Sequence, residues 1–95
     1  MATLGEKWGY INLKVIKRDG RAVEYDSNKI ILAIEKANKE VGEEKRTSKD
    51  EILSIINFIE SLDKKRILVE DIQDIIEQKL MELKKYDLAK KYIVY

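Results

Sequence analysis

An Asp19-Gly20 pair between two runs of strand-forming residues is the feature that most limits how this chain can fold. The pair is the strongest short-range signal for a β-hairpin, because both central positions of a type I′ turn need a positive φ. We therefore predict strands over residues 11–17 and 21–25 joined by a two-residue turn. In that register each face of the hairpin is partly apolar, which predicts that both faces are covered: Leu13, Val15 and Ala22 on one, Ile16, Val23 and Tyr25 on the other.

Basic side chains gather around this turn and the start of the next segment: Lys17, Arg18, Arg21 and Lys29. With a two-residue loop, Arg18 lies directly opposite Arg21, and such a like-charge pair costs stability. Asp26 followed by Ser27 indicates a helix N-cap, which puts Lys29 in the first helical turn. The helix dipole disfavours a cation there, and the free N–H groups favour an anion. These unfavourable placements indicate an anionic ligand such as phosphate.

A second interpretation of the same cations remains open. In it, Lys29 pairs with Asp26 or Glu24, and the basic side chains of the hairpin are simply solvated, as exposed charges usually are. The two interpretations differ in what neutralises the charges. In the first it is a ligand, and in the second it is solvent and the protein's own carboxylates.

Two helices are predicted after the hairpin. Apolar residues recur at helical spacing from Ser27 to about Val41, and Gly42 is well placed to end this first helix. A polar loop follows. Ser48 and Glu51 then form a capping-box pattern, and a stripe of isoleucines extends the second helix as far as Leu62.

The last third of the chain predicts one more strand and two more helices. Residues 66–69 are too short and too branched for a helix, which favours a third strand beside the hairpin. Acidic residues open a third helix over residues 70–83, and Asp87 is placed to cap a short fourth helix. The predicted order is β-β-α-α-β-α-α.

Length and composition exclude several classes of function. Ninety-five residues without a proline-rich or serine-rich break make one domain, residues 11–95, preceded by a loosely attached lead-in, residues 1–10. A net charge of +1 lacks the basic excess of a nucleic-acid-binding protein, and no segment has the apolar length of a signal peptide or a membrane span, so we expect a cytosolic protein. Cys and His are absent, which removes a disulfide framework, a Cys/His zinc site, a thiol nucleophile and an imidazole general base.

Neither a Walker loop nor a dinucleotide-binding glycine pattern is present among the four glycines. Nucleotide binding would therefore rest on side-chain cations and a helix end. Glu70, Asp71 and Asp74 could be taken for a metal or acid–base cluster, but acidic residues at a helix start are more often complements of the dipole. We therefore expect no metal site and no catalytic residue.

Two separated motifs give the sequence a specific resemblance. The run from Val15 to Arg21, followed by Tyr25-Asp26 and Lys29-Ile30, resembles the amino-terminal signature of the ATP-cone domain. Residues 69–77 and 89–95 are similar to the third and fourth helices of that family. The resemblance covers residues 11–95, and it implies an α+β fold in which a four-helix bundle is capped by a small three-stranded sheet.

The resemblance also implies a function and a partner. ATP cones bind ATP or dATP without consuming it, with Mg²⁺ as a candidate companion ion, and they control the activity or oligomeric state of a host such as ribonucleotide reductase. The expected partners are therefore an adenine nucleotide, a host catalytic or regulatory domain and, through the cone, further copies of the chain. Neither a nucleic acid nor a membrane is an expected partner.

Residue by residue, the resemblance implies a nucleotide site under the hairpin, against the start of the first helix. Val15 and Ile30 would contact the adenine or ribose, Lys17, Arg18 and Lys29 the phosphates, and Asp26 the nucleoside. Val69 and Gln73 lie where the start of the third helix would approach the ligand, and Arg21 is a further candidate contact. Asp19 and Gly20 are expected to hold the turn.

Two other functions remain as alternatives. The domain could keep the cone shape and serve only to assemble partners without nucleotide. It could also be a nucleotide hydrolase or kinase, which the missing Walker loop, His and Cys disfavour.

Overall fold

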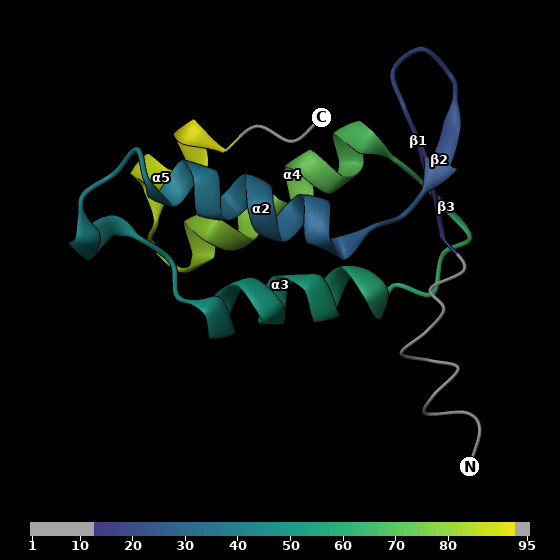
Figure 1. Cartoon of the computed structure of the whole chain (residues 1–95). Helices are drawn as coiled ribbons and strands as arrows, with labels where there is room; N and C mark the ends of the chain where they lie inside the picture. Colours follow the sequence, from purple (N-terminus) through teal and green to yellow (C-terminus); the bar gives the residue numbers. More distant parts are fainter. Residues whose placement is uncertain (1–12, 93–95) are drawn as a thin grey trace.

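A small sheet stands at one end of a group of helices in the computed structural model, which describes residues 13–92 (Figure 1). The strands are β1 (Lys14–Ile16), β2 (Ala22–Glu24) and β3 (Arg66–Leu68). The helices are α2 (Ser27–Asn38), α3 (Lys49–Glu60), α4 (Val69–Glu82) and α5 (Tyr86–Lys91), with a 3₁₀ turn, η1 (Glu43–Lys45), between α2 and α3. The predicted element order and the α+β class are confirmed. The expected lead-in, residues 1–10, lies outside the described residues.

β1 is the central strand of the sheet, whose order is β2-β1-β3. It pairs antiparallel with β2 and parallel with β3, where Val15 lies opposite Ile67. A parallel pair needs a long crossover, and here α2 and α3 supply it. The prediction of a third strand beside the hairpin is therefore confirmed, and β3 leads directly into α4.

The hairpin loop is one residue longer than predicted. Ile16 pairs with Ala22, and the Lys17 N–H donates to the Arg21 carbonyl at 2.8 Å, which leaves the three residues 18–20 as the loop. The Gly20 N–H donates to the Lys17 carbonyl at 2.9 Å, and of the loop residues only Gly20 has a positive φ, 91°. This is a type I turn followed by a left-handed glycine. The predicted type I′ turn is wrong. The Asp19 carboxylate accepts the Arg21 backbone N–H at 3.1 Å, a local bond that favours the longer turn.

The longer loop also changes which side chains share a face, because shifting a register by one residue turns a strand's side chains to the other face. The observed register unites Val15 with Val23, and the flanking Leu13 with Tyr25, on the face that packs into the core. The opposite face carries an ion pair between Lys14 and Glu24. The predicted grouping of Ala22 with Val15 is therefore wrong, as is the prediction that both faces are covered.

The helices bury the isoleucine stripes that the sequence predicts. Each of α2, α3 and α4 contributes three or four apolar residues to one core. The largest side chains that are fully buried there are Ile30, Ile34, Ile52, Ile72, Ile76, Leu80, Leu88 and Tyr92, together with Val15 of the sheet. The sheet and the bundle therefore share a single hydrophobic core.

α2 begins as predicted and ends earlier. Asp26 is its N-cap and accepts the Asn28 N–H at 2.9 Å. The helix stops at Asn38, because the Asn38 side chain exchanges two hydrogen bonds with the Thr47 backbone, at 3.0 and 3.1 Å, and its carbonyl accepts Arg46 Nε. Gly42 does not end α2. It precedes η1 with an ordinary φ of −64°.

The other helix starts are confirmed in part. The capping box of Ser48 and Glu51 is present at the start of α3. Leu62 lies beyond the end of α3, and α4 starts at Val69, one residue before the predicted position. Asp87 does not cap α5. It lies inside the first turn and forms an ion pair with Lys45 at 2.6 Å.

The capping box makes the stability of the fold depend on pH. The pKa of Glu51 lies below its usual value, because the Ser48 backbone N–H and then the Thr47 hydroxyl donate to its carboxylate. A group whose pKa is lowered by folding stabilises the protein above its unfolded pKa, and this stabilisation is lost as the pH falls through the folded pKa. We expect Glu51→Gln to lower the free energy of unfolding by about 1 kcal/mol at neutral pH.

Urea unfolding at a series of pH values measures this effect. The difference in the free energy of unfolding between Glu51→Gln and the unmodified chain should disappear as the pH falls below the ordinary pKa of a glutamate. Glu35→Gln removes an exposed carboxylate from the middle of α2 and serves as the control. A gap of constant size at every pH would contradict the capping role.

Candidate functional site

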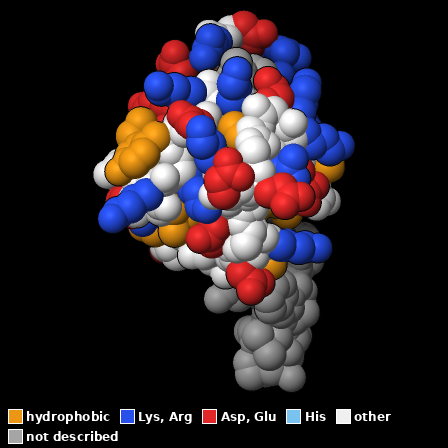
Figure 2. All heavy atoms as spheres, turned by 90° about the vertical axis from the view of Figure 1, so that its left-hand side faces the viewer, with side chains coloured by type: hydrophobic (Ala, Val, Ile, Leu, Met, Phe, Trp, Pro, Cys, Tyr) orange, Lys and Arg blue, Asp and Glu red, His pale blue; other side chains and the backbone are white. Residues whose placement is uncertain are grey.

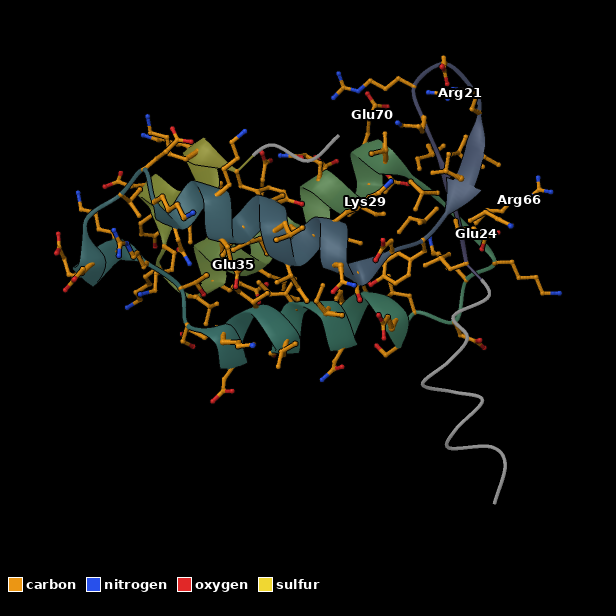
Figure 3. All side chains as sticks on the ribbon, viewed as in Figure 1. Arg21, Glu24, Lys29, Glu35, Arg66 and Glu70 are labelled. Atoms are coloured by element: carbon orange, nitrogen blue, oxygen red, sulfur yellow. The ribbon has the colours of Figure 1, made fainter. Side chains whose placement is uncertain are left out.

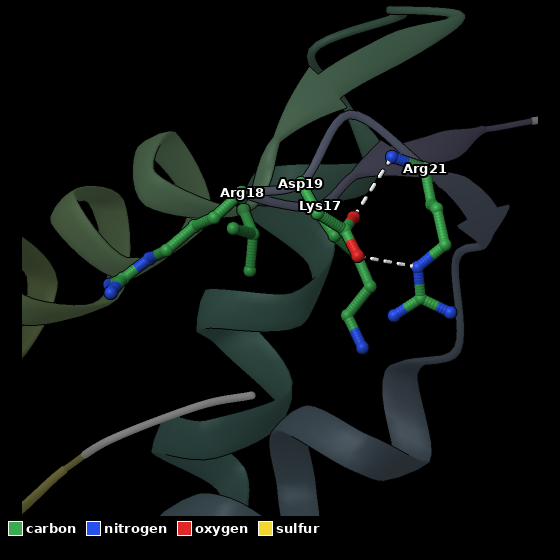
Figure 4. A pocket seen from close by; sticks show the side chains of 5 residues that line it. Lys17, Arg18, Asp19 and Arg21 are labelled. Atoms are coloured by element: carbon green, nitrogen blue, oxygen red, sulfur yellow. Dashed lines mark hydrogen bonds and ion pairs between the residues drawn. The ribbon is translucent and has the colours of Figure 1, made fainter.

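The tip of the hairpin carries two cations on its inner face. Lys17 and Arg21 are directly opposite each other, two residues beyond Val15 and before Val23 along their strands. Because side chains alternate between faces, this pair lies on the same side as the buried Val15 and the partly buried Val23. Figure 4 shows both side chains running to one side of the hairpin. The predicted opposition of Arg18 and Arg21 is therefore wrong, and the like-charge pair is Lys17 with Arg21.

Asp19 lies between these two cations and partly neutralises them. Its Oδ1 accepts the Arg21 backbone N–H at 3.1 Å, and its Oδ2 accepts Arg21 Nε at 2.7 Å. The bond from the Arg21 backbone, and then the one from its guanidinium, lower the pKa of the Asp19 carboxyl below its usual value, and Lys17 adds to this shift. Asp19 therefore remains ionised, and it fixes one edge of the Arg21 side chain.

Arg18 points away from this pair. In Figure 4 its side chain extends in a different direction from those of Lys17 and Arg21. Its Nε lies 3.9 Å from Oε2 of Glu70, at the start of α4, and the two side chains are 74% and 65% exposed. An ion pair this long and this exposed contributes little to stability. Arg18 could therefore exchange Glu70 for another anionic partner at little cost in free energy.

An open depression of about 210 Å³ lies at the tip of the hairpin. It is lined by Lys17, Arg18, Asp19, Arg21 and Val69. Ligand pockets usually have volumes of about 300–1,000 Å³, so this depression suits one end of a ligand better than a whole nucleotide. With three basic side chains in its lining, that end would be an anion.

The start of α4 forms one wall of this depression. Val69 is the first residue of the helix, and the preceding Leu68 supplies no side-chain hydrogen bond to it within the described residues. The first N–H groups of a helix favour an anion. Glu70 and Asp71 in the same turn already complement the dipole in part, which makes this wall weaker for anions than the hairpin.

Lys29 lies in the first turn of α2, as predicted, and that turn contains no acidic residue. In Figure 3 it lies on the side of α2 that is nearest the hairpin and the start of α4. Of the two carboxylates that the alternative interpretation assigns to Lys29, Glu24 forms an ion pair with Lys14, and Asp26 accepts the Asn28 N–H as the N-cap. Each of these carboxylates therefore has at least one partner besides any contact with Lys29.

The expected adenine contacts lie beneath the surface. Val15 and Ile30 are 0% exposed, and Val69 is 5% exposed. Gln73 donates from Nε2 to Glu77 at 2.9 Å and to the Tyr92 carbonyl at 3.1 Å, which joins α4 to the residue after α5. The structure therefore brings Lys17, Arg18, Arg21 and Val69 around the depression. Of the other candidates, Val15 and Ile30 lie in the core and Gln73 is half-buried on α4, whereas Asp26 and Lys29 are exposed at the start of α2. That these residues contact a nucleotide stays a prediction.

Sequence reasoning assigned Asp19 only to the turn, and it gave Glu70 no link to the hairpin. The spacing of Asp19 two residues before Arg21 is a signal from which their contact could have been predicted, because a turn aspartate commonly accepts the backbone N–H two residues ahead. Nothing local points to the approach of Glu70 to Arg18, since 52 residues of sequence separate them.

A second depression, of about 270 Å³, lies at the η1 end of the bundle. Lys45 and Asp87, which line it, form an ion pair at 2.6 Å, and this pairing raises the pKa of Lys45 and lowers that of Asp87. Figure 2 looks at this end of the molecule and shows basic and acidic side chains interspersed. Because neither sign of charge dominates there, the hairpin tip is the better anion site.

Among the described residues, 13–92, no three or more His, Cys, Asp or Glu side chains are arranged to hold a metal ion. The same part of the chain contains no helix with the length and apolar character needed to cross a membrane.

Comparison with known proteins gives consistent matches over nearly the whole chain. A family profile described as the ATP cone domain matches residues 13–95. The ribonucleoside-diphosphate reductase subunit alpha of Chlamydia trachomatis is 34% identical over 100 aligned positions, which cover 94% of this chain and 10% of that protein. The vitamin B12-dependent ribonucleoside-diphosphate reductase of Thermoplasma acidophilum is 41% identical over 88 positions, covering 86% of this chain and 11% of that protein. The chain thus spans about a tenth of the length of these curated relatives.

The loop that presents the cations depends on one backbone conformation. A Cβ at Gly20 would meet no atom within 4 Å, so substitution there is sterically open, but its φ of 91° strains any residue with a side chain. We expect Gly20→Ala to lower the free energy of unfolding by about 1–2 kcal/mol. Gly20→Asn should lower the free energy of unfolding by less, because asparagine tolerates a positive φ better than alanine does. Urea unfolding of both variants checks this, and an equal loss in both would contradict the assignment of the cost to the backbone.

Proposed function

The chain belongs to the ATP cone domain family, whose members are in general allosteric nucleotide-binding regulatory domains, and we propose that it binds ATP or dATP at the hairpin tip. The observation that supports this most is the placement of Lys17 and Arg21 opposite each other on the inner face of the hairpin. The Asp19 carboxylate offsets part of the repulsion between these two like charges, and a phosphate beside them would offset more of it.

The triphosphate is the part of the ligand that this geometry suits best. Lys17 and Arg21 line the depression from one side, and Arg18 lies close to the start of α4 on another. Lys29 in the first turn of α2 would supply a further cation, in a helix whose first turn has no acidic residue. Arginine can bind a phosphate through two parallel N–H donors, while lysine acts as a point charge.

The nucleoside would then lie deeper, toward Val15, Ile30 and Val69, with Asp26 and Gln73 at its edge. Val15 and Ile30 have no exposed surface in this structure. Direct contact with them therefore requires the hairpin to move away from α2 when nucleotide binds. The exposed contact between Arg18 and Glu70 would add little resistance, so the main cost of such a movement is the exposure of these core side chains.

This arrangement offers a route from the ligand to the rest of the domain. β3 pairs with the hairpin and continues without a break into α4, so a shift of the hairpin would act on the start of that helix. Gln73 then links α4 to the Tyr92 carbonyl. We propose that the host is a ribonucleotide reductase, that the bound nucleotide controls its activity or oligomeric state, and that this domain regulates without turning over its ligand.

Calorimetry with ATP, dATP and GTP, combined with thermal melts, tests the proposal. At about 100 times its dissociation constant, a ligand that binds only the folded state should stabilise the domain by about 2.7 kcal/mol. We expect this stabilisation with ATP or dATP and a smaller one with GTP. Lys17→Gln and Lys29→Gln should both weaken it, since each removes a cation from the proposed phosphate site.

Lys64→Gln is the matched control, because it removes one lysine charge from the exposed connection between α3 and β3. Binding by this variant should equal that of the unmodified chain. A melt that is insensitive to all three nucleotides would reject the nucleotide site and favour the alternative of a module that only assembles partners. Release of phosphate from ATP, lost in Lys17→Gln, would instead indicate an enzyme.

A further inference from the structure

We propose that Asp19 is a positioning residue for nucleotide binding, one that holds the Arg21 guanidinium in the orientation in which it receives a phosphate. The proposal rests on the proposed function of the hairpin tip. It differs from the sequence-based expectation, in which Asp19 only holds the turn. The observation behind it is that both oxygens of the Asp19 carboxylate bond the same residue, at 3.1 Å to the Arg21 backbone N–H and at 2.7 Å to its Nε.

These two bonds leave the outer edge of the guanidinium available. An arginine side chain has five N–H donors, of which Nε carries one and the two terminal nitrogens carry four. Asp19 engages Nε, so the terminal pair remains for the two parallel bonds with which arginine binds phosphate. Arg21 and Asp19 both line the depression at the tip, which places this edge beside the site.

Holding Arg21 in advance also lowers the cost of binding. An arginine side chain has many rotamers, and a ligand that must order it loses affinity. Without Asp19, the opposed charges of Lys17 and Arg21 would drive the two side chains apart. The Asp19 carboxylate instead attracts both of them, Arg21 through two hydrogen bonds and Lys17 through a weaker charge interaction that also lowers the pKa of Asp19.

An opposite effect of Asp19 is also physically reasonable, and this makes the proposal testable. A carboxylate in the wall of an anion site repels a phosphate, so removing its charge should tighten binding if electrostatic repulsion dominates. The proposal predicts the reverse. Asp19→Asn is the appropriate variant, because asparagine suits the same turn position and keeps an oxygen that can accept the Arg21 backbone N–H.

The experiment is calorimetric titration of the whole 95-residue chain with ATP. We expect Asp19→Asn to weaken ATP binding about fivefold, the size of effect expected from one exposed charge-assisted hydrogen bond. Asp63→Asn makes the same change of charge in the exposed connection between α3 and β3, at a position where φ is 55° and asparagine is tolerated. This control should bind ATP as the unmodified chain does. Thermal melts without ligand check that both variants fold.

A double-mutant cycle separates positioning from a general effect on the hairpin. In an Arg21→Met background, Asp19→Asn should cause no further loss of ATP affinity, because the side chain on which it acts is gone. Equal losses in both backgrounds, or tighter binding by Asp19→Asn, would overturn the proposal while leaving nucleotide binding in place. Failure of the unmodified chain to bind ATP would overturn the proposed function, and this inference with it.

Discussion

The burial of one face of the hairpin against the helices is the constraint on which the rest of this structure depends. Val15 in the central strand is completely shielded from solvent and pairs with Val23 on one side and Ile67 on the other. Because side chains alternate along a strand, burying these residues also decides where the next ones on that face must lie. Lys17 and Arg21 follow them, so the apolar inner face of the sheet continues as a cationic surface at its tip.

This continuity links the stability of the fold to the proposed function. The residues that anchor the hairpin belong to the same core as those that join the helices, and the cations extend just beyond the part that the core covers. The tip is held less firmly, by a turn, by the bonds from Arg21 to Asp19 and by a long, exposed contact from Arg18 to α4. A rigid base with a weakly held tip suits a regulatory domain, in which a ligand has to shift a populated structure.

Features that depend on neighbouring residues could be predicted with success. The N-cap at Asp26, the capping box at Ser48 and the isoleucine stripes all follow from spacings within one or two helical turns. The end of α2 could not, because Asn38 stops the helix by bonding Arg46 and Thr47 across a loop. The position of Asp87 likewise predicted a helix cap, but its carboxylate instead forms an ion pair with Lys45, which is distant in the sequence.

The sequence by itself determined the order of the elements, the apolar face of each helix and the presence of cations around one turn, because these follow from local spacing and side-chain chemistry. Only the tertiary structure decided which cations face the site. The loop contains three residues instead of two. The additional residue places Lys17 opposite Arg21, while Arg18 lies in the loop and contacts Glu70 at the start of α4. The physical reason is the packing of Val15 in the core and of Val23 against it, which selects the register that the local bond from Arg21 to Asp19 also favours.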